Sequence, residues 1–222
     1  MAINDEQIKK EVVDQLYWDQ SVDASDVIVE VSDGRVTLKG TVPSLGTRTA
    51  AHTDALIIPG VLSVDNQLAV ELPPALPAAT DNEIKMRAEN VLAWSADTHG
   101  TNISVSVAAG HVTLNGHVDT YWKKMRAEEL VSDLIGVLRV ENALSVTPTE
   151  TLTDKLIAGD IMAALKRRMD LDINLVDVAV DNRVVTLSGT VPNWSALVDV
   201  ERTARYTAGV VDVVNDLGVR AV

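Results

Sequence analysis

The chain repeats one pattern of residues three times, and this repeat constrains its fold more than any other feature. A VTLxG motif recurs with an offset of 76 residues from Val36 to Val112 and of 73 residues from Val112 to Val185. A later GVxxVxNxL motif keeps the same two offsets, so one register holds through each copy and predicts three copies of one folding unit. The motifs occupy Val36–Val42, Val112–Val118 and Val185–Val191, and then Gly60–Leu68, Gly136–Leu144 and Gly209–Leu217.

Three domains of about 70 residues follow from the repeat, each close to the lower size limit for an independently stable fold. Their predicted extents are 1–72, 79–147 and 152–222. A proline-rich segment, Leu72–Ala79, joins the first two copies and is typical of a semi-stiff polyproline-type spacer. A shorter segment around Pro148 joins the last two. We therefore expect short connections to hold the three domains near one another.

Each copy begins with a predicted helix and continues into a predicted strand. In the first copy Ile8, Val12 and Leu16 recur at helical spacing and share one face. Asp5 is expected to cap this helix at its N-terminus. Alternation of inward and outward residues over Val27–Val31 then predicts a strand with one buried and one solvated face.

The second half of each copy is predicted to form a hairpin, a helix and a last strand. A tight turn with positive φ is expected at Asp33-Gly34. Gly40, after the returning strand, is expected to let the strand bend or to admit a neighbouring backbone. A second helix from about Ser44 is predicted to stop at Gly60, and the strand Val61–Leu68 closes the unit. The equivalent turns are Ala109-Gly110 and Asn182-Arg183.

The predicted fold class is α/β (α+β), with three tandem αββαβ two-layer modules. Each module is expected to place two helices on one face of a three-stranded mixed sheet, and a right-handed crossover makes the last strand parallel to the second. Residues such as Thr37, Lys39, Ser104 and Ser106 predict that the other face of each sheet is polar.

Composition excludes several classes of partner. The net charge of −13, from 19 basic and 32 acidic residues, opposes binding to nucleic acid and broad docking on an anionic bilayer. The chain has no cysteine, so disulfides and thiol chemistry are excluded. No run reaches the ~18 apolar residues that a membrane span needs. The N-terminus has no apolar leader, so we expect a soluble cytoplasmic protein, or a periplasmic one if a leader was removed.

The repeated motifs resemble the BON domain family, named for bacterial osmotically inducible and nodulation proteins. The residues that carry the likeness are the helix-opening Asp-x-x-Ile, VTLxG after the hairpin, and GVxxVxNxL with Asn66, Asn142 and Asn215. The resemblance implies an αββαβ fold without enzymatic activity. It also implies roles in phospholipid or membrane association and in osmotic stress, with potassium binding in some cytoplasmic members.

The residues that differ between copies are the better candidates for a site. Tyr121, Trp122, Lys123, Lys124 and Arg126 combine aromatic and basic side chains where the hairpin of the second copy meets its second helix. This set is the predicted contact for lipid headgroups or a protein partner.

Trp18 and Trp94 end the first helix of two copies, where an interfacial contact, inter-domain packing or the edge of the core would each explain them. Arg167 replaces them in the third copy, inside the basic run Lys166–Arg168, which complements a helix C-terminus.

No motif predicts catalysis, a cofactor or a divalent metal. His111 and His117 lie six residues apart on one strand, roughly 20 Å from each other at 3.3 Å per residue, so they cannot share an ion. Asp170–Asn174 imitates the opening of a calcium loop, but Leu175 stands where that loop needs glycine. A monovalent-ion site built of loop carbonyls would leave no side-chain pattern.

Three functions therefore stay open for this non-enzymatic chain. The first is association with a phospholipid or membrane surface, linked to osmotic or envelope stress, through the aromatic and basic residues of the second copy. The second is binding or sensing of a monovalent ion such as potassium. The third is a protein-interaction scaffold. The sequence does not determine the oligomeric state.

Overall fold

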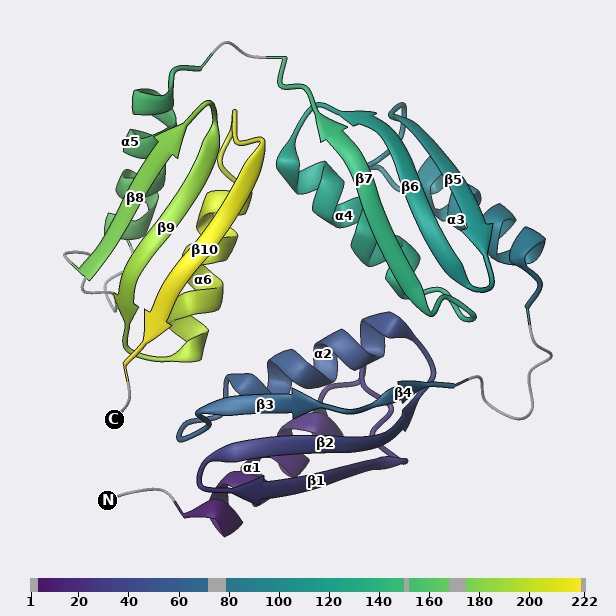
Figure 1. The fold of residues 1–222 in the computed structure, drawn as a ribbon, viewed down its shortest axis with the longest axis vertical. Coiled ribbons are helices and arrows are strands. Elements are labelled where there is room, and N and C mark those ends of the chain that lie inside the picture. The colour runs from purple at the N-terminus through teal and green to yellow at the C-terminus, as the bar shows by residue number, and fades with distance from the viewer. Residues whose placement is uncertain (1–3, 72–78, 150–151, 168–174, 221–222) are drawn as a thin grey trace. The chain divides into compact units, whose positions relative to one another are not determined.

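The computed structural model describes residues 4–71, 79–149, 152–167 and 175–220, and these fold into three α/β modules of the same element order (Figure 1). Most of the predicted spacer Leu72–Ala79 and the whole calcium-like segment Asp170–Asn174 lie outside the described residues.

Each module runs helix, strand, strand, helix, strand, and only the first divides its last strand into two. The first module contains α1 (Asp5–Trp18), β1 (Val27–Ser32), β2 (Arg35–Val42), α2 (Leu45–Leu56), β3 (Ser63–Asn66) and β4 (Ala69–Val70). The second contains α3 (Asp81–Trp94), β5 (Asn102–Ala108), β6 (His111–Val118), α4 (Tyr121–Ser132) and β7 (Arg139–Val146). The third contains α5 (Asp154–Lys166), β8 (Val176–Asp181), β9 (Val184–Val191), α6 (Trp194–Arg205) and β10 (Asp212–Val219).

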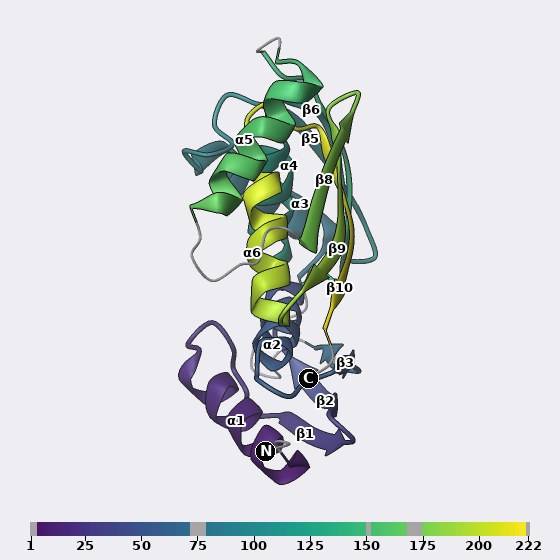
Figure 2. The same ribbon diagram turned by 90° about the vertical axis from the view of Figure 1, so that its left-hand side faces the viewer.

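The sheets have the predicted topology. β1 pairs antiparallel with β2, and β3 and β4 pair parallel with β2. The third module repeats this arrangement, with β9 between antiparallel β8 and parallel β10, and the second has the order β5-β6-β7. The two helices of a module cover the same face of its sheet, as the turned view shows for α5 and α6 (Figure 2). The predicted fold class is thus confirmed.

The buried faces of the helices follow the predicted spacing. Ile8, Val12 and Leu16 of α1 are at most 1% exposed and pack on the valines and leucines of β1 and β2. Because Val and Leu fill the space between helix and sheet, the core needs no phenylalanine. The equivalent buried residues are Ile84, Ala88 and Leu92 in α3, and Ile157, Ile161 and Leu165 in α5.

The repeated aspartate does not cap its helix, so that prediction is wrong. The N-caps are Asn4, Thr80 and Thr153, whose side chains accept backbone N–H groups. Asp5 is the first helical residue, and its two carboxylate oxygens accept hydrogen bonds from the backbone N–H groups of the hairpin turn, Asp33 at 2.9 Å and Gly34 at 3.0 Å.

The same two bonds recur in the other modules, and we call this contact the Asp–turn lock. Asp81 accepts from Ala109 and Gly110 at 2.8 and 2.9 Å. Asp154 accepts from Asn182 and Arg183 at 3.1 and 2.9 Å. The turn residues have positive φ, as predicted, which points both N–H groups the same way. Two donors that the tight turn leaves unpaired thus gain a charged acceptor.

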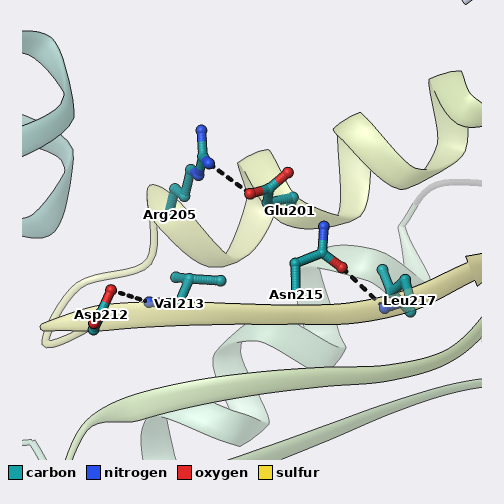
Figure 3. Close-up of polar contacts among 6 residues, drawn as sticks. All are labelled: Glu201, Arg205, Asp212, Val213, Asn215 and Leu217. Carbon is teal, nitrogen blue, oxygen red and sulfur yellow. Dashed lines mark hydrogen bonds and ion pairs between the residues drawn. The ribbon is translucent and has the colours of Figure 1, made fainter. Parts of the chain in front are cut away.

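In the first and third modules, the side chain of the repeated asparagine bonds to the backbone two residues later in the chain. Figure 3 shows the Asn215 side chain on β10, where its Oδ1 accepts from Leu217 N at 3.1 Å. Asn66 makes the same bond to Leu68 N, and its amide also donates to the Arg48 carbonyl at 2.8 Å. This asparagine therefore joins the last strand to the second helix in the first module.

Two predicted element ends differ from the structure. The second helices stop before Gly60, Gly136 and Gly209. α2 ends at Leu56, and α4 and α6 end at the equivalent residues, Ser132 and Arg205. An i→i+3 bond from Val61 N to Ile58 O closes a separate turn, in which Gly60 has a φ of +89°. The last strand of the first module begins at Ser63 rather than Val61 and is interrupted after Asn66.

One exposed glycine lies inside a helix without a structural need for it. A Cβ at Gly159 of α5 would meet no atom within 4 Å. Because glycine costs about 1 kcal/mol relative to alanine inside an exposed helix, Gly159→Ala is expected to stabilise the third module by about that amount. Hydrogen exchange of α5 amides in the full chain measures the change. Ala163→Gly, also exposed on α5, should have the opposite effect, and equal protection in all three proteins would contradict the prediction.

Candidate functional site

The predicted aromatic and basic residues of the second module lie together on α4, but they are largely covered. Tyr121 is 7% exposed, and burial raises the pKa of its hydroxyl. Trp122, Lys123, Lys124 and Arg126 are each half-buried.

Several of these side chains already have partners within the chain. Lys123 Nζ lies 2.9 Å from the Asp119 carboxylate. The Trp122 ring lies 5.8 Å from that of Tyr206, within the compact unit that includes Asn115–Arg126 and Leu144–Val222. The structure therefore brings the predicted residues together on one helix, with less free aromatic surface than their sequence pattern implied.

The most exposed aromatic side chains of the described residues lie instead at the ends of the first helices. Trp18 is 77% exposed at the end of α1, and Trp94 is 89% exposed at the end of α3. Tyr17 is also exposed and packs edge-on against Trp18, with ring centroids 5.5 Å apart. We call Tyr17, Trp18 and Trp94 the helix-end aromatics. Their exposure shows that the core-edge interpretation of these tryptophans is wrong.

Helix geometry explains this exposure. Leu16 is the last buried residue of α1, and successive residues turn by about 100° around a helix. Trp18 therefore points roughly 200° away from Leu16, on the side opposite the sheet. Trp94 follows the buried Leu92 by the same two positions. The spacing to the buried residue was the signal in the sequence that could have revealed the exposed tryptophans.

Trp18 lies beside acidic side chains, and neither Trp18 nor Trp94 has a basic residue in the last turn of its helix. Trp18 is followed by Asp19, the C-cap of α1, and Asp14 is exposed one turn earlier. Neither α1 nor α3 has a basic residue in its last turn. In the third module that end of the helix is basic instead, with Lys166 and the C-cap Arg167 both exposed. A contact made by Trp18 and Trp94 would therefore depend on apolar surface, not on attraction to an anion.

A buried carboxyl between α1 and α2 was missed in the sequence. Asp54 is 7% exposed, and burial raises its pKa to about 6, with Asp19 adding to the rise. Leu130 and Thr203 occupy the same position in the other modules. The signal in the sequence that could have revealed this buried carboxyl is the position of Asp54, next to the small inward-facing residues Ala51 and Ala55 of the second helix.

No described group of side chains has the composition of a metal site. Within residues 4–71, 79–149, 152–167 and 175–220, no three His, Asp or Glu side chains cluster in a way that could hold a metal ion. His111 and His117 lie at the two ends of β6, as expected. In the same described part of the chain, no helix combines the length and apolarity needed to cross a bilayer.

Comparison with known proteins defines the class that this fold represents, a tandem array of small α+β modules. The model of the BON domain matches residues 4–71, 80–148 and 153–221. The chain therefore belongs to the BON domain family, with three copies of the domain.

More distant comparisons add little. A search of curated proteins gives no significant match. Among solved structures, the chain is similar to CdsD, a structural protein of the type III secretion system of Chlamydia trachomatis, at 15% identity, covering 95% of this chain and 91% of that one with a TM-score of 0.27. A structure described as the C-terminal domain of CdsD matches at 14% identity, with 99% and 100% coverage and a TM-score of 0.27.

Proposed function

We propose that this protein docks on phospholipid surfaces through its helix-end aromatics. The observation that carries the proposal is the exposure of Trp18 and Trp94, 77% and 89%, at the same position of two modules. Indole and phenol rings are stable where apolar material meets water, as at the headgroup level of a bilayer. Association of BON domains with phospholipid binding and osmotic stress supports a role for this docking at a membrane under such stress.

The charge of the protein determines which lipids it should prefer. A net charge of −13 repels an anionic surface, while the rings gain energy from any headgroup layer. We therefore expect binding to zwitterionic vesicles to exceed binding to anionic ones. Added salt should reduce this difference, because it screens the repulsion.

Removal of the two tryptophans is the first functional prediction. If docking buries roughly 30 Å² more apolar surface of each ring, each contributes about 0.75 kcal/mol at 25 cal/mol per Å². The Trp18→Ala/Trp94→Ala protein should therefore bind phosphatidylcholine vesicles about tenfold more weakly in co-sedimentation. Both side chains are exposed, so the fold should survive, which circular dichroism checks.

A second variant distinguishes the contribution of the helix-end aromatics to vesicle binding from that of the α4 residues predicted from the sequence. Trp122→Ala/Lys123→Gln/Lys124→Gln removes the aromatic and basic set on α4 and leaves Trp18 and Trp94 in place. We expect its vesicle binding to stay within about twofold of the parent, a difference of about 0.4 kcal/mol. If only this variant lost binding, the lipid contact would lie on α4 rather than at the helix ends. Absence of binding by the parent to every vesicle would overturn the function itself.

A further inference from the structure

We propose that the first module contains a proton-operated contact between α1 and α2, in which Asp19 and Asp54 share one proton. Both residues stand at helix C-termini: Asp19 is the C-cap of α1, and Asp54 lies in the last turn of α2. The inference is independent of lipid docking, because it concerns packing inside one module.

Burial of the Asp54 carboxyl is the first step. Its side chain is 7% exposed, and its Oδ1 accepts a hydrogen bond from Gln15 Nε2 at 3.2 Å. Its Oδ2 is fully buried and has no hydrogen-bond donor from the protein. An ionised carboxylate in this position would leave one charged oxygen without compensation, which is costly.

The position of Asp19 shows how that oxygen can be satisfied. Asp19 follows Gln15 by one turn of α1, so its carboxyl lies on the side of the helix that bonds to Asp54, and it accepts from Ser21 N at 2.8 Å. Two ionised carboxylates offer only acceptors and repel one another. One proton between them provides the missing donor and removes the repulsion. The negative ends of both helix dipoles also favour the protonated form.

Other titratable groups near α2 do not supply the donor that the buried Asp54 oxygen lacks. Arg48 donates to the Asn66 carbonyl, on the strand side of α2. Burial and the nearby Arg48 lower the pKa of His52. Arg35 and Asp65 of the sheet are exposed, and Lys39 forms an ion pair with Glu30. None of these charged groups forms an ion pair with Asp54.

Comparison with the second module indicates that this pair of carboxyls is particular to the first module. The positions of Gln15, Asp19 and Asp54 are held there by Val91, Ser95 and Leu130, in helices of the same length. The fold therefore forms in the second module without a carboxyl at any of these positions, whereas the first module has two.

The sign of the pH dependence follows from linkage. Folding raises the pKa of Asp54, so the folded module holds a proton that the unfolded chain has already released. The contribution of the pair is complete below the usual carboxyl pKa of 3.8 and is lost as the pH rises through about 6. The equilibrium constant for opening the α1–α2 contact should rise about a hundredfold across this range.

The test is a carboxyl ¹³C NMR titration of the full-length protein, together with hydrogen exchange of α1 and α2 amides between pH 4 and 7. We expect the Asp54 carboxyl to titrate near 6 and protection, corrected for intrinsic exchange, to fall with rising pH. Asp54→Asn keeps an acceptor for Gln15 and supplies a donor to Asp19, so it should make protection independent of pH.

Two further proteins make the result decisive. His52→Gln should retain the full pH dependence of the parent. Gln15→Val/Asp54→Leu copies the second module and should also remove the dependence, even if Asp54→Asn folds poorly. An Asp54 titration near 4, or unchanged pH dependence in the Gln15→Val/Asp54→Leu protein, would overturn the proposal.

Discussion

Gly116→Ala is expected to destabilise the second module by more than about 3 kcal/mol. Gly116 has a φ of +128°, which L-residues rarely adopt, and a Cβ there would lie 2.0 Å from the Asn102 carbonyl oxygen on the neighbouring strand. No rotamer change relieves a clash between Cβ and backbone. The two strands would have to separate or the bend in β6 would have to be lost.

Hydrogen exchange of β5 and β6 amides in the full chain measures this effect. Gly100→Ala is the matched control, because Gly100 also has a positive φ, +77°, but a Cβ there meets no atom within 4 Å. It should cost only about 1 kcal/mol, the usual strain of a left-handed alanine. Equal protection losses in the two variants would show that the close backbone approach is unimportant. Gly40 and Gly189 make the same approach in the other modules.

Asp154→Ala is expected to destabilise the third module by about 2 kcal/mol, because two backbone donors of its hairpin turn lose a charged acceptor. Asp154→Asn retains one acceptor oxygen and should cost about half as much. Asp160→Ala removes an exposed carboxylate from the same helix, two turns further along, and serves as the control. The measurement is denaturant-dependent exchange of β8 and β9 amides.

The test of the Asp–turn lock compares how much amide protection each of the three variants loses. We expect Asp154→Ala to lose the most protection, Asp154→Asn less, and Asp160→Ala little. A loss for Asp154→Ala no larger than for Asp160→Ala would mean that the turn holds its shape unaided. In the second module, the turn N–H groups lower the pKa of Asp81, so its contribution should persist above pH 3.8 and fade as the pH drops below it.

The sequence predicted those features that depend on neighbouring residues. Helical and alternating periodicity located the buried faces of α1 and β1, because burial repeats with the geometry of each element. The positive φ of the Asp33-Gly34 turn and the close approach at Gly40 were also predicted, since residue type limits the backbone there.

Features that depend on distant partners were not predicted. The Asp5 carboxylate was assigned to its own helix, whereas its acceptor role involves a turn 28 and 29 residues later. The end of α2 was placed at Gly60, because glycine is a common terminator and the intervening turn has no strong signal of its own. The burial of the Asp54 carboxyl depends on the packing of α1 on α2.

Quenching of tryptophan fluorescence by brominated lipid tests the central claim most directly. A Trp122→Phe/Trp194→Phe protein leaves Trp18 and Trp94 as the only indole rings in the chain. With phosphatidylcholine vesicles brominated near the headgroup, we predict strong quenching and a blue-shifted emission, and weaker quenching when the bromines lie deep in the acyl chains. Quenching no stronger than with unbrominated vesicles, under conditions where the protein co-sediments, would contradict docking through the ends of α1 and α3.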